Sequence, residues 1–251
     1  MRQVFLASVM FLALSAPNSH AETINNAEQY KACMTLVHRA PDEAFDAGLT
    51  WKGLGGGEAA EHCIATALIA MKRYKFGSER LEKLADTSRR PKEFKAKILA
   101  QAAQGWFLAN ELDHARAVIT TAISLDENQS DFYVDRAQMR SAQHAYKEAL
   151  EDLNKALSLD GINVDALVFR GTIYRLTENF EAAYKDISQA LALEPGNPEA
   201  LLERGMLHRI EGQDEFARHD WLEVLEINPN GKTAETARLN LEKMDVKHQE
   251  K

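Results

Sequence analysis

Residues 164–197 read VDALVFRGTIYRLTENFEAAYKDISQALALEPGN, and neighbouring segments repeat the pattern of this stretch. Two small residues, Gly171 and Ala183, stand where two antiparallel helices would cross, so that their backbones can approach closely. Pro195 and Gly196 favour an end to the second helix, because proline cannot continue a helix and glycine tolerates left-handed geometry. The stretch therefore predicts a pair of antiparallel helices joined by a short turn.

The small residues recur with a strict period from residue 96 onward. One crossing position holds Ala103, Ala137, Gly171 and Gly205, and the other holds Ala115, Ala149, Ala183 and Ala217. A divergent copy precedes them, and residues 92–95 shift the frame between the two. Small residues at both positions in four successive copies are very unlikely by chance. We therefore expect five repeats, at 58–91, 96–129, 130–163, 164–197 and 198–231.

The repeated pattern resembles the tetratricopeptide repeat, whose signature includes glycine, tyrosine, alanine and proline at the spacing of Gly171, Tyr174, Ala183 and Pro195. The family's aromatic positions hold aliphatic Leu167 and Ile187. The resemblance implies an all-α, right-handed superhelical solenoid of antiparallel helix pairs. Before the repeats, residues 22–57 are expected to form an N-terminal capping helix pair. After them, residues 232–251 are expected to form a C-terminal capping helix and tail.

Residues 1–21 have the pattern of a secretory signal peptide. Arg2 supplies the positive charge, residues 4–14 form an apolar run too short to span a bilayer comfortably, and small residues precede a cut after Ala21. We expect cleavage, with retention as an uncleaved anchor as the alternative. The prediction is an exported protein, periplasmic or secreted, with no membrane insertion after cleavage.

The chain has two cysteines, Cys33 and Cys63. An even count in an exported protein favours a disulfide bond, and two free buried thiols are the alternative. The two residues are separated by about one repeat, which would place them on adjacent helices. Neither lies in a CxxC motif, so a redox-active pair is not indicated.

Three repeats carry an arginine and an aspartate at one matched pair of positions. The pairs are Arg136 with Asp152, Arg170 with Asp186, and Arg204 with Asp220. Repeat two has Ala102 and Val118 there, so both partners are lost together, which argues for a physical contact. Because arginine can hold a carboxylate through two hydrogen bonds, we expect structural ion pairs between packed helices. Ligand binding by these arginines is the alternative.

The first helix of each pair should line the concave side of a solenoid. The residues predicted to face the resulting partner-binding groove are Gln104, Phe107, Val134, Gln138, Val168, Thr172, Arg175, Leu202, Met206 and Arg209. Phe107 could instead belong to the core. Apolar and amide groups in the middle of this set favour an extended peptide or a partner helix. We expect Arg175 and Arg209 to receive an acidic group of that partner.

No sequence motif indicates catalysis. The glycine-rich segment 53–57 lacks the lysine and hydroxyl residue that complete a phosphate-binding loop, and the histidines do not group with carboxylates at a metal-site spacing. The formal net charge of −8 disfavours binding to nucleic acid or to anionic membranes. We therefore expect no catalytic activity, no cofactor and no metal ion.

The sequence is interpreted as an exported scaffold or adaptor that binds a protein or peptide in its concave groove. One alternative is a structural assembly subunit that uses its convex face or its caps. A less favoured alternative is an envelope polysaccharide-binding or enzymatic protein. The sequence leaves the oligomeric state and the identity of the partner open.

Overall fold

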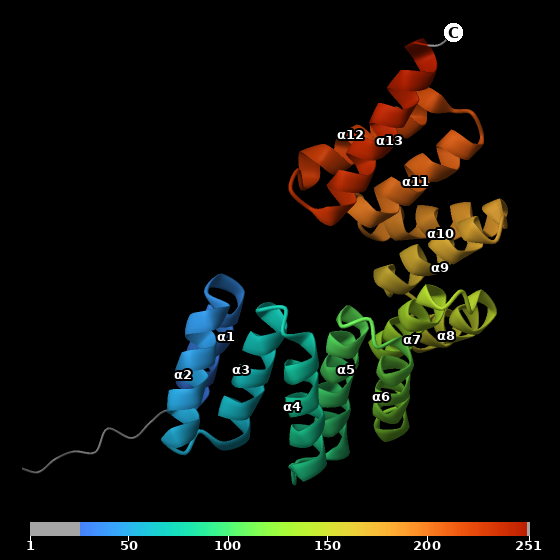
Figure 1. Ribbon diagram of the computed structural model, residues 1–251. Helices are drawn as coiled ribbons and strands as arrows, with labels where there is room; N and C mark the ends of the chain where they lie inside the picture. Colours follow the sequence, from blue (N-terminus) through green and yellow to red (C-terminus); the bar gives the residue numbers. More distant parts are fainter. Residues whose placement is uncertain (1–25, 250–251) are drawn as a thin grey trace, which may run out of the picture.

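The structure is a computed structural model that describes residues 26–249, so the predicted signal peptide, residues 1–21, lies outside the described residues. Within residues 26–249 the chain forms thirteen α-helices and no strand (Figure 1). None of these helices combines the length and the apolar character that crossing a membrane requires. The all-α solenoid that the repeats predict is confirmed.

The helices follow one another with short connections. In chain order they are α1 (Asn26–Arg39), α2 (Pro41–Gly53), α3 (Gly57–Ala70), α4 (Tyr74–Thr87), α5 (Lys92–Leu108), α6 (Leu112–Leu125), α7 (Ser130–Ala142), α8 (Tyr146–Leu159), α9 (Val164–Leu176), α10 (Phe180–Leu193), α11 (Pro198–Ile210), α12 (Asp214–Ile227) and α13 (Lys232–Gln249). Residues 92–95, which interrupt the sequence period, form the first turn of α5.

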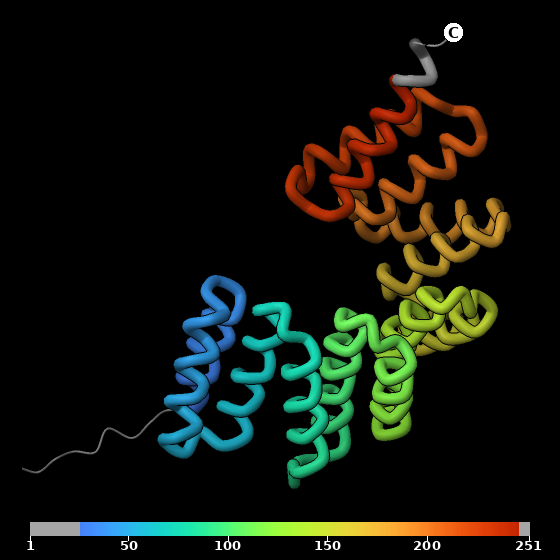
Figure 2. The backbone as a smooth tube through the Cα atoms, viewed as in Figure 1, coloured from blue at the N-terminus to red at the C-terminus, as the bar shows by residue number. Residues whose placement is uncertain are grey.

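Each helix packs mainly on the helices before and after it in the chain. Odd-numbered helices also contact one another directly, α1 with α3 and each of α5, α7, α9 and α11 with the next odd-numbered helix, and a hydrogen bond between His62 and Gln101 joins α3 to α5. The odd-numbered helices therefore lie closer together than the even-numbered helices do. They are therefore the inner helices of the curve, and the even-numbered helices are the outer ones. The helices before and after α7 and α8 form two arms that meet there, and α1 and α13 stand at opposite ends of the curve (Figures 1 and 2).

The small residues of the repeat permit close helix crossing. A Cβ atom added to Gly171 would lie 2.8 Å from the Ile187 side chain, and one added to Gly205 would lie 2.4 Å from the Trp221 ring. The alanines at the matching positions of the other repeats are completely buried. Because a Cβ atom at either glycine would overlap its neighbour, any larger residue at these two positions would require the Ile187 or the Trp221 side chain to move.

Asparagines cap three of the helices in the strictly periodic region. The side-chain oxygens of Asn163, Asn179 and Asn197 accept hydrogen bonds from backbone N–H groups in the first turns of α9, α10 and α11. Such caps satisfy N–H groups that have no partner inside the helix. They fix the point at which each helix begins.

The two ends of the solenoid close its core differently. At the N-terminal end, Cys33 of α1 and Cys63 of α3 form a disulfide bond, and their Cα atoms are 6.2 Å apart. At the C-terminal end, α13 buries Ala237, Leu241 and Met244 against α11 and α12, while the residues between them are largely exposed. A terminal helix with one apolar face covers the last repeat without continuing the stack.

Candidate partner-binding groove

All ten residues predicted for the groove lie on inner helices, from α5 to α11. Their side chains are not equally accessible. Val134 and Val168 are only 5% and 8% exposed and belong to the hydrophobic core. The expectation that these two valines contact a partner is therefore corrected, because they already pack inside the chain. The half-buried residues of the set are Gln104, Phe107, Gln138, Thr172, Arg175, Leu202, Met206 and Arg209.

The two arginines of the predicted groove have carboxylate partners within the chain. Arg175 on α9 donates from Nε and Nη2 to the carboxylate of Glu203 on α11, at 2.6 and 3.2 Å. Arg209 pairs with Asp214 at the start of α12. The hypothesis that both guanidinium groups require an acidic group from a partner is replaced by this internal pairing.

Polar side chains connect the inner helices of the N-terminal arm without an ion pair. The buried imidazole of His62 on α3 lies 2.9 Å from the Tyr30 hydroxyl on α1 and 2.6 Å from Gln101 Oε1 on α5. Because Gln101 Oε1 can only accept, His62 must donate from Nε2 and accept from Tyr30 at Nδ1. Burial lowers the pKa of His62, and the hydrogen bond with Gln101 partly offsets this effect. A neutral imidazole therefore joins three inner helices.

Asp135 occupies the junction between the two arms. It lies on α7 and accepts a hydrogen bond of 2.5 Å from Gln104 Nε2 on α5. Burial raises the pKa of Asp135 to about 7, and the charges of Asp131 and Asp165 add to the rise while the hydrogen bond from Gln104 opposes it. This carboxylate was not among the predicted site residues. The amino-acid sequence gives no signal that Asp135 is part of a site, since the burial of this side chain depends on how α5 and α7 meet.

Three exposed carboxylates stand at matching positions on successive inner helices, and we call them the acidic row: Asp131 on α7, Asp165 on α9 and Glu199 on α11. Each lies in the first turn of its helix, where a negative charge interacts favourably with the helix dipole. Partial desolvation by the surrounding helices raises the pKa of Asp165, although its side chain reaches the surface, and the charges of Glu194, Asp131 and Glu199 add to the rise. The row is therefore a region of mutual repulsion.

Only part of the acidic row has hydrogen-bond partners. Asp131 accepts from Asn163 Nδ2 at 3.0 Å, and Glu199 accepts from the Thr233 hydroxyl at 2.8 Å. Asp165 has no hydrogen-bond donor among the described residues. The inner face between α7 and α11 therefore carries uncompensated negative charge next to half-buried apolar and amide groups.

The repeated arginine–aspartate pairs join the inner and outer helix of each repeat. Each arginine donates from Nε and Nη2 to the two oxygens of its aspartate, at distances between 2.6 and 3.0 Å. The aspartates are buried, with exposures of 4%, 2% and 3% in chain order. Each buried carboxylate therefore has the bidentate arginine partner that the sequence pattern predicts.

One histidine lies near carboxylates in a way that the sequence did not indicate. His219, Asp220 and Glu223 on α12 bring ligand-type atoms within 4.8 Å of one another. However, Asp220 is buried and accepts both hydrogen bonds from Arg204. Binding of a metal ion there would compete with that ion pair.

Comparison with known proteins supports the resemblance to the tetratricopeptide repeat. Residues 164–197 match the model of the tetratricopeptide repeat family. A search of curated proteins finds no match. Residues 164–197 are therefore a tetratricopeptide repeat by sequence, and the helix pairs on either side of them have the same antiparallel arrangement.

Solved structures share the fold at low sequence identity. The protein described under "Functional Characterization of Pseudomonas Aeruginosa pilF" has a TM-score of 0.64 at 13% identity, over 86% of this chain and 97% of that one. TTC0263, a thermophilic TPR protein of Thermus thermophilus, has a TM-score of 0.62 at 17% identity, over 76% and 100%. YrrB, described as a TPR protein with an unusual peptide-binding site, has a TM-score of 0.50 at 14% identity, over 75% and 95%.

Proposed function

We propose that this protein is an exported, non-catalytic scaffold whose concave face binds an extended, basic segment of a partner protein. The observation that carries the proposal is the acidic row, Asp131, Asp165 and Glu199, on three successive inner helices. An extended peptide that crosses these helices would place alternate side chains at the row. Lysine or arginine at those positions would compensate the repulsion among the carboxylates.

Half-buried side chains beside the acidic row supply the rest of the groove. Thr172 lies on α9, and Leu202 and Met206 lie on α11. Apolar groups of a bound peptide can pack against Leu202 and Met206. YrrB, a TPR protein with an unusual peptide-binding site, supports a peptide as the ligand class.

Export is the second component of the proposal. It rests on the signal-like residues 1–21 and on the disulfide bond between Cys33 and Cys63, because disulfides persist in oxidising compartments. Detection of the processed protein in the culture medium or the periplasmic fraction, with an N-terminus at Glu22, is the expected result. An unprocessed chain in the cytoplasmic fraction would contradict export.

Two synthetic peptides test the groove. One alternates lysine with leucine and the other alternates glutamate with leucine, and each is titrated into the purified protein. We expect the lysine peptide to bind and the glutamate peptide not to bind. The double variant Asp131→Lys with Asp165→Lys should lose the binding of the lysine peptide.

A matched control separates the groove from net charge. Glu151→Lys with Glu181→Lys makes the same change in charge at exposed positions on the outer helices α8 and α10. This control should bind the lysine peptide nearly as the parent does. Equal loss of binding in both double variants, or tighter binding of the glutamate peptide, would contradict the proposal.

Assembly through the convex face is the second candidate function. It is favoured by large apolar side chains on outer helices, since Phe76 on α4 is 64% exposed and Phe216 on α12 is 61% exposed. Exposed aromatic groups of this size are typical of contact surfaces. Concentration-dependent self-association that Phe216→Ser abolishes would favour this candidate.

A further inference from the structure

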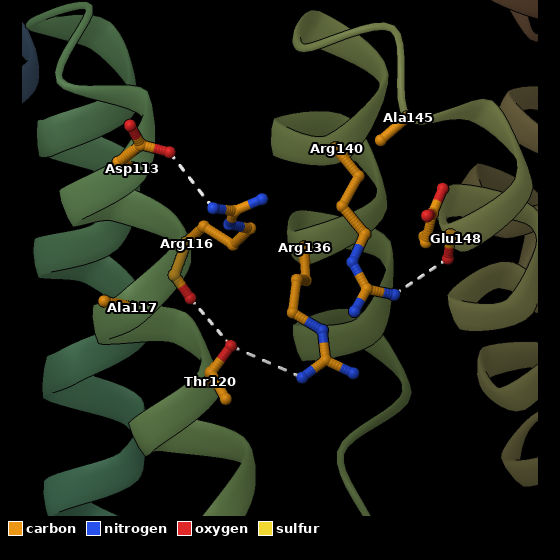
Figure 3. Close-up of a pocket in the computed structure, with 8 residues that line it drawn as sticks. All are labelled: Asp113, Arg116, Ala117, Thr120, Arg136, Arg140, Ala145 and Glu148. Carbon is orange, nitrogen blue, oxygen red and sulfur yellow. Dashed lines mark hydrogen bonds and ion pairs between the residues drawn. The ribbon is translucent and has the colours of Figure 1, made fainter.

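A hollow of about 560 Å³ lies between α6, α7 and the start of α8 (Figure 3). Three arginines line it: Arg116 comes from α6, and Arg136 and Arg140 come from α7. The other lining residues are Asp113, Ala117, Thr120, Ala145 and Glu148. The hollow is formed by the outer helices α6 and α8 together with the inner helix α7, and no residue of the acidic row lines it.

Two of the arginines share one buried carboxylate. Arg136 Nη2 lies 2.6 Å from Asp152 Oδ1, and Arg140 Nη1 lies 2.7 Å from Asp152 Oδ2. The side chains of Arg136, Arg140 and Asp152 are 15%, 22% and 5% exposed. Two largely buried cations on one carboxylate leave a net positive charge of one in this cluster, which is unfavourable away from water.

The neighbouring acidic groups do not compensate this charge. Glu148 contacts Arg140 only through its backbone carbonyl, at 2.8 Å, and its carboxylate turns away (Figure 3). Asp113 is exposed and pairs with Arg116 at 3.0 Å. In the part of the chain that the structure describes, Nε and Nη2 of Arg140 have no acceptor.

The equivalent places in the following repeats are filled by packing side chains. Arg136 recurs as Arg170 and Arg204, each with its own aspartate. Arg116 and Arg140, however, correspond to Leu150 and Tyr174 one repeat later, and both of these pack against the hydrophobic core. The fold therefore does not require the two additional guanidinium groups, and the hollow occurs where they replace apolar side chains.

We propose that this hollow binds an oxyanion, a phosphate or carboxylate group, between Arg116, Arg136 and Arg140. Guanidinium groups present parallel N–H donors that match the oxygens of such anions. The bound anion would compensate the excess positive charge while Asp152 keeps its contacts. The site does not depend on the groove, since none of the residues that line it belongs to the acidic row or to the predicted groove residues, and its charges have the opposite sign.

The test is a titration of the purified protein with sodium phosphate and with sodium acetate, each against sodium chloride at equal ionic strength. Thermal unfolding gives the affinity, and the NMR signals of the arginine Nε–H groups locate the site. We expect phosphate, acetate or both to raise the melting temperature beyond the effect of chloride. Phosphate alone would identify a phosphate site, and a response to both would identify a general oxyanion site.

Two variants and a control make the test specific. Arg140→Tyr installs the residue of the following repeat and should abolish the anion-specific rise with the helical signal intact. Arg116→Gln, at a more exposed position, should weaken the affinity about tenfold. Arg218 occupies the position of Arg116 three repeats later and pairs with Asp245. Arg218→Gln should therefore leave the anion-specific rise in melting temperature unchanged. An unchanged response in Arg140→Tyr, or no difference from chloride in the parent, would overturn the proposal.

Discussion

The two arms of the solenoid hold their helices together by different chemistry. In α7 to α12 every repeat has an arginine–aspartate pair with a buried carboxylate between its inner and outer helix. The corresponding positions of the first two repeats hold Ile64 with Arg80 and Ala102 with Val118. There Arg80 pairs with Glu61 and not with an aspartate, and the N-terminal arm also has a disulfide bond and the neutral contacts of His62. Where the sequence period is strict, the same arginine–aspartate pair recurs in each repeat. Where the repeats diverge, the helices are joined by contacts that each occur only once.

The largest expected loss of stability comes from breaking one of the recurring arginine–aspartate pairs. Asp186→Ala would leave Arg170 largely buried without its carboxylate and should destabilise the protein by about 3 kcal/mol or more. The double variant with Arg170→Ala should cost less than the sum of the single variants, because neither charge is then left alone. Urea unfolding measured by the helical signal gives the energies, with Glu181→Ala on the exposed face as the control. Additive single effects would show that the two groups do not interact.

The next largest loss of stability is expected from removing the disulfide bond of the N-terminal arm. Cys33→Ala with Cys63→Ala should cost about 3 kcal/mol, since the disulfide restricts the unfolded chain. Thiol titration of the unfolded, unreduced protein should detect no free thiol. Two free thiols in that titration would mean that the bond does not form. Reductant should destabilise the parent and leave the double variant unchanged.

A smaller effect concerns Asp135, where the two arms meet. Its folded pKa of about 7 lies above its unfolded value near 3.8, so its contribution to stability is present below pH 3.8 and is lost as the pH rises to about 7. Asp135→Asn keeps an acceptor for Gln104 and removes the charge. It should therefore stabilise the protein by about 2 kcal/mol at pH 8 and have little effect at pH 4.

Unfolding by urea at both pH values measures this difference. Gln104→Leu removes the hydrogen bond to the same carboxylate and should destabilise more at pH 8 than at pH 4, in the opposite direction to Asp135→Asn. A gain in Asp135→Asn that is equal at both pH values would mean that the carboxylate does not titrate near neutrality.

The sequence predicts the fold because the fold depends on local and periodic features. Small residues at the crossing positions, such as Gly171 and Ala183, and helix-ending residues such as Pro195 act within one helix pair. The arginine–aspartate pairs are also predictable, since repeat two loses both partners together. The period does not predict that residues 92–95, which interrupt it, form the first turn of α5.

The groove was predicted less well because its properties depend on contacts between repeats. A helical face identifies Val134 and Val168 as inward-facing but does not show that neighbouring helices cover them. The period places Arg175 and Arg209 on one face, but their pairing with Glu203 and Asp214 depends on side-chain geometry. Once those pairs form, the remaining charge of the inner face is acidic. The proposed partner is therefore basic and not acidic.

The most direct measurement of the central claim is site-specific photo-crosslinking in the native compartment. A photoreactive amino acid replaces Gln138 on the inner helix α7 or, in a second strain, Lys185 on the outer helix α10. We predict an adduct with a partner protein at Gln138 and none at Lys185, and sequencing of the crosslinked peptide should identify a basic segment. Adducts at Lys185 with none at Gln138 would contradict binding in the concave groove.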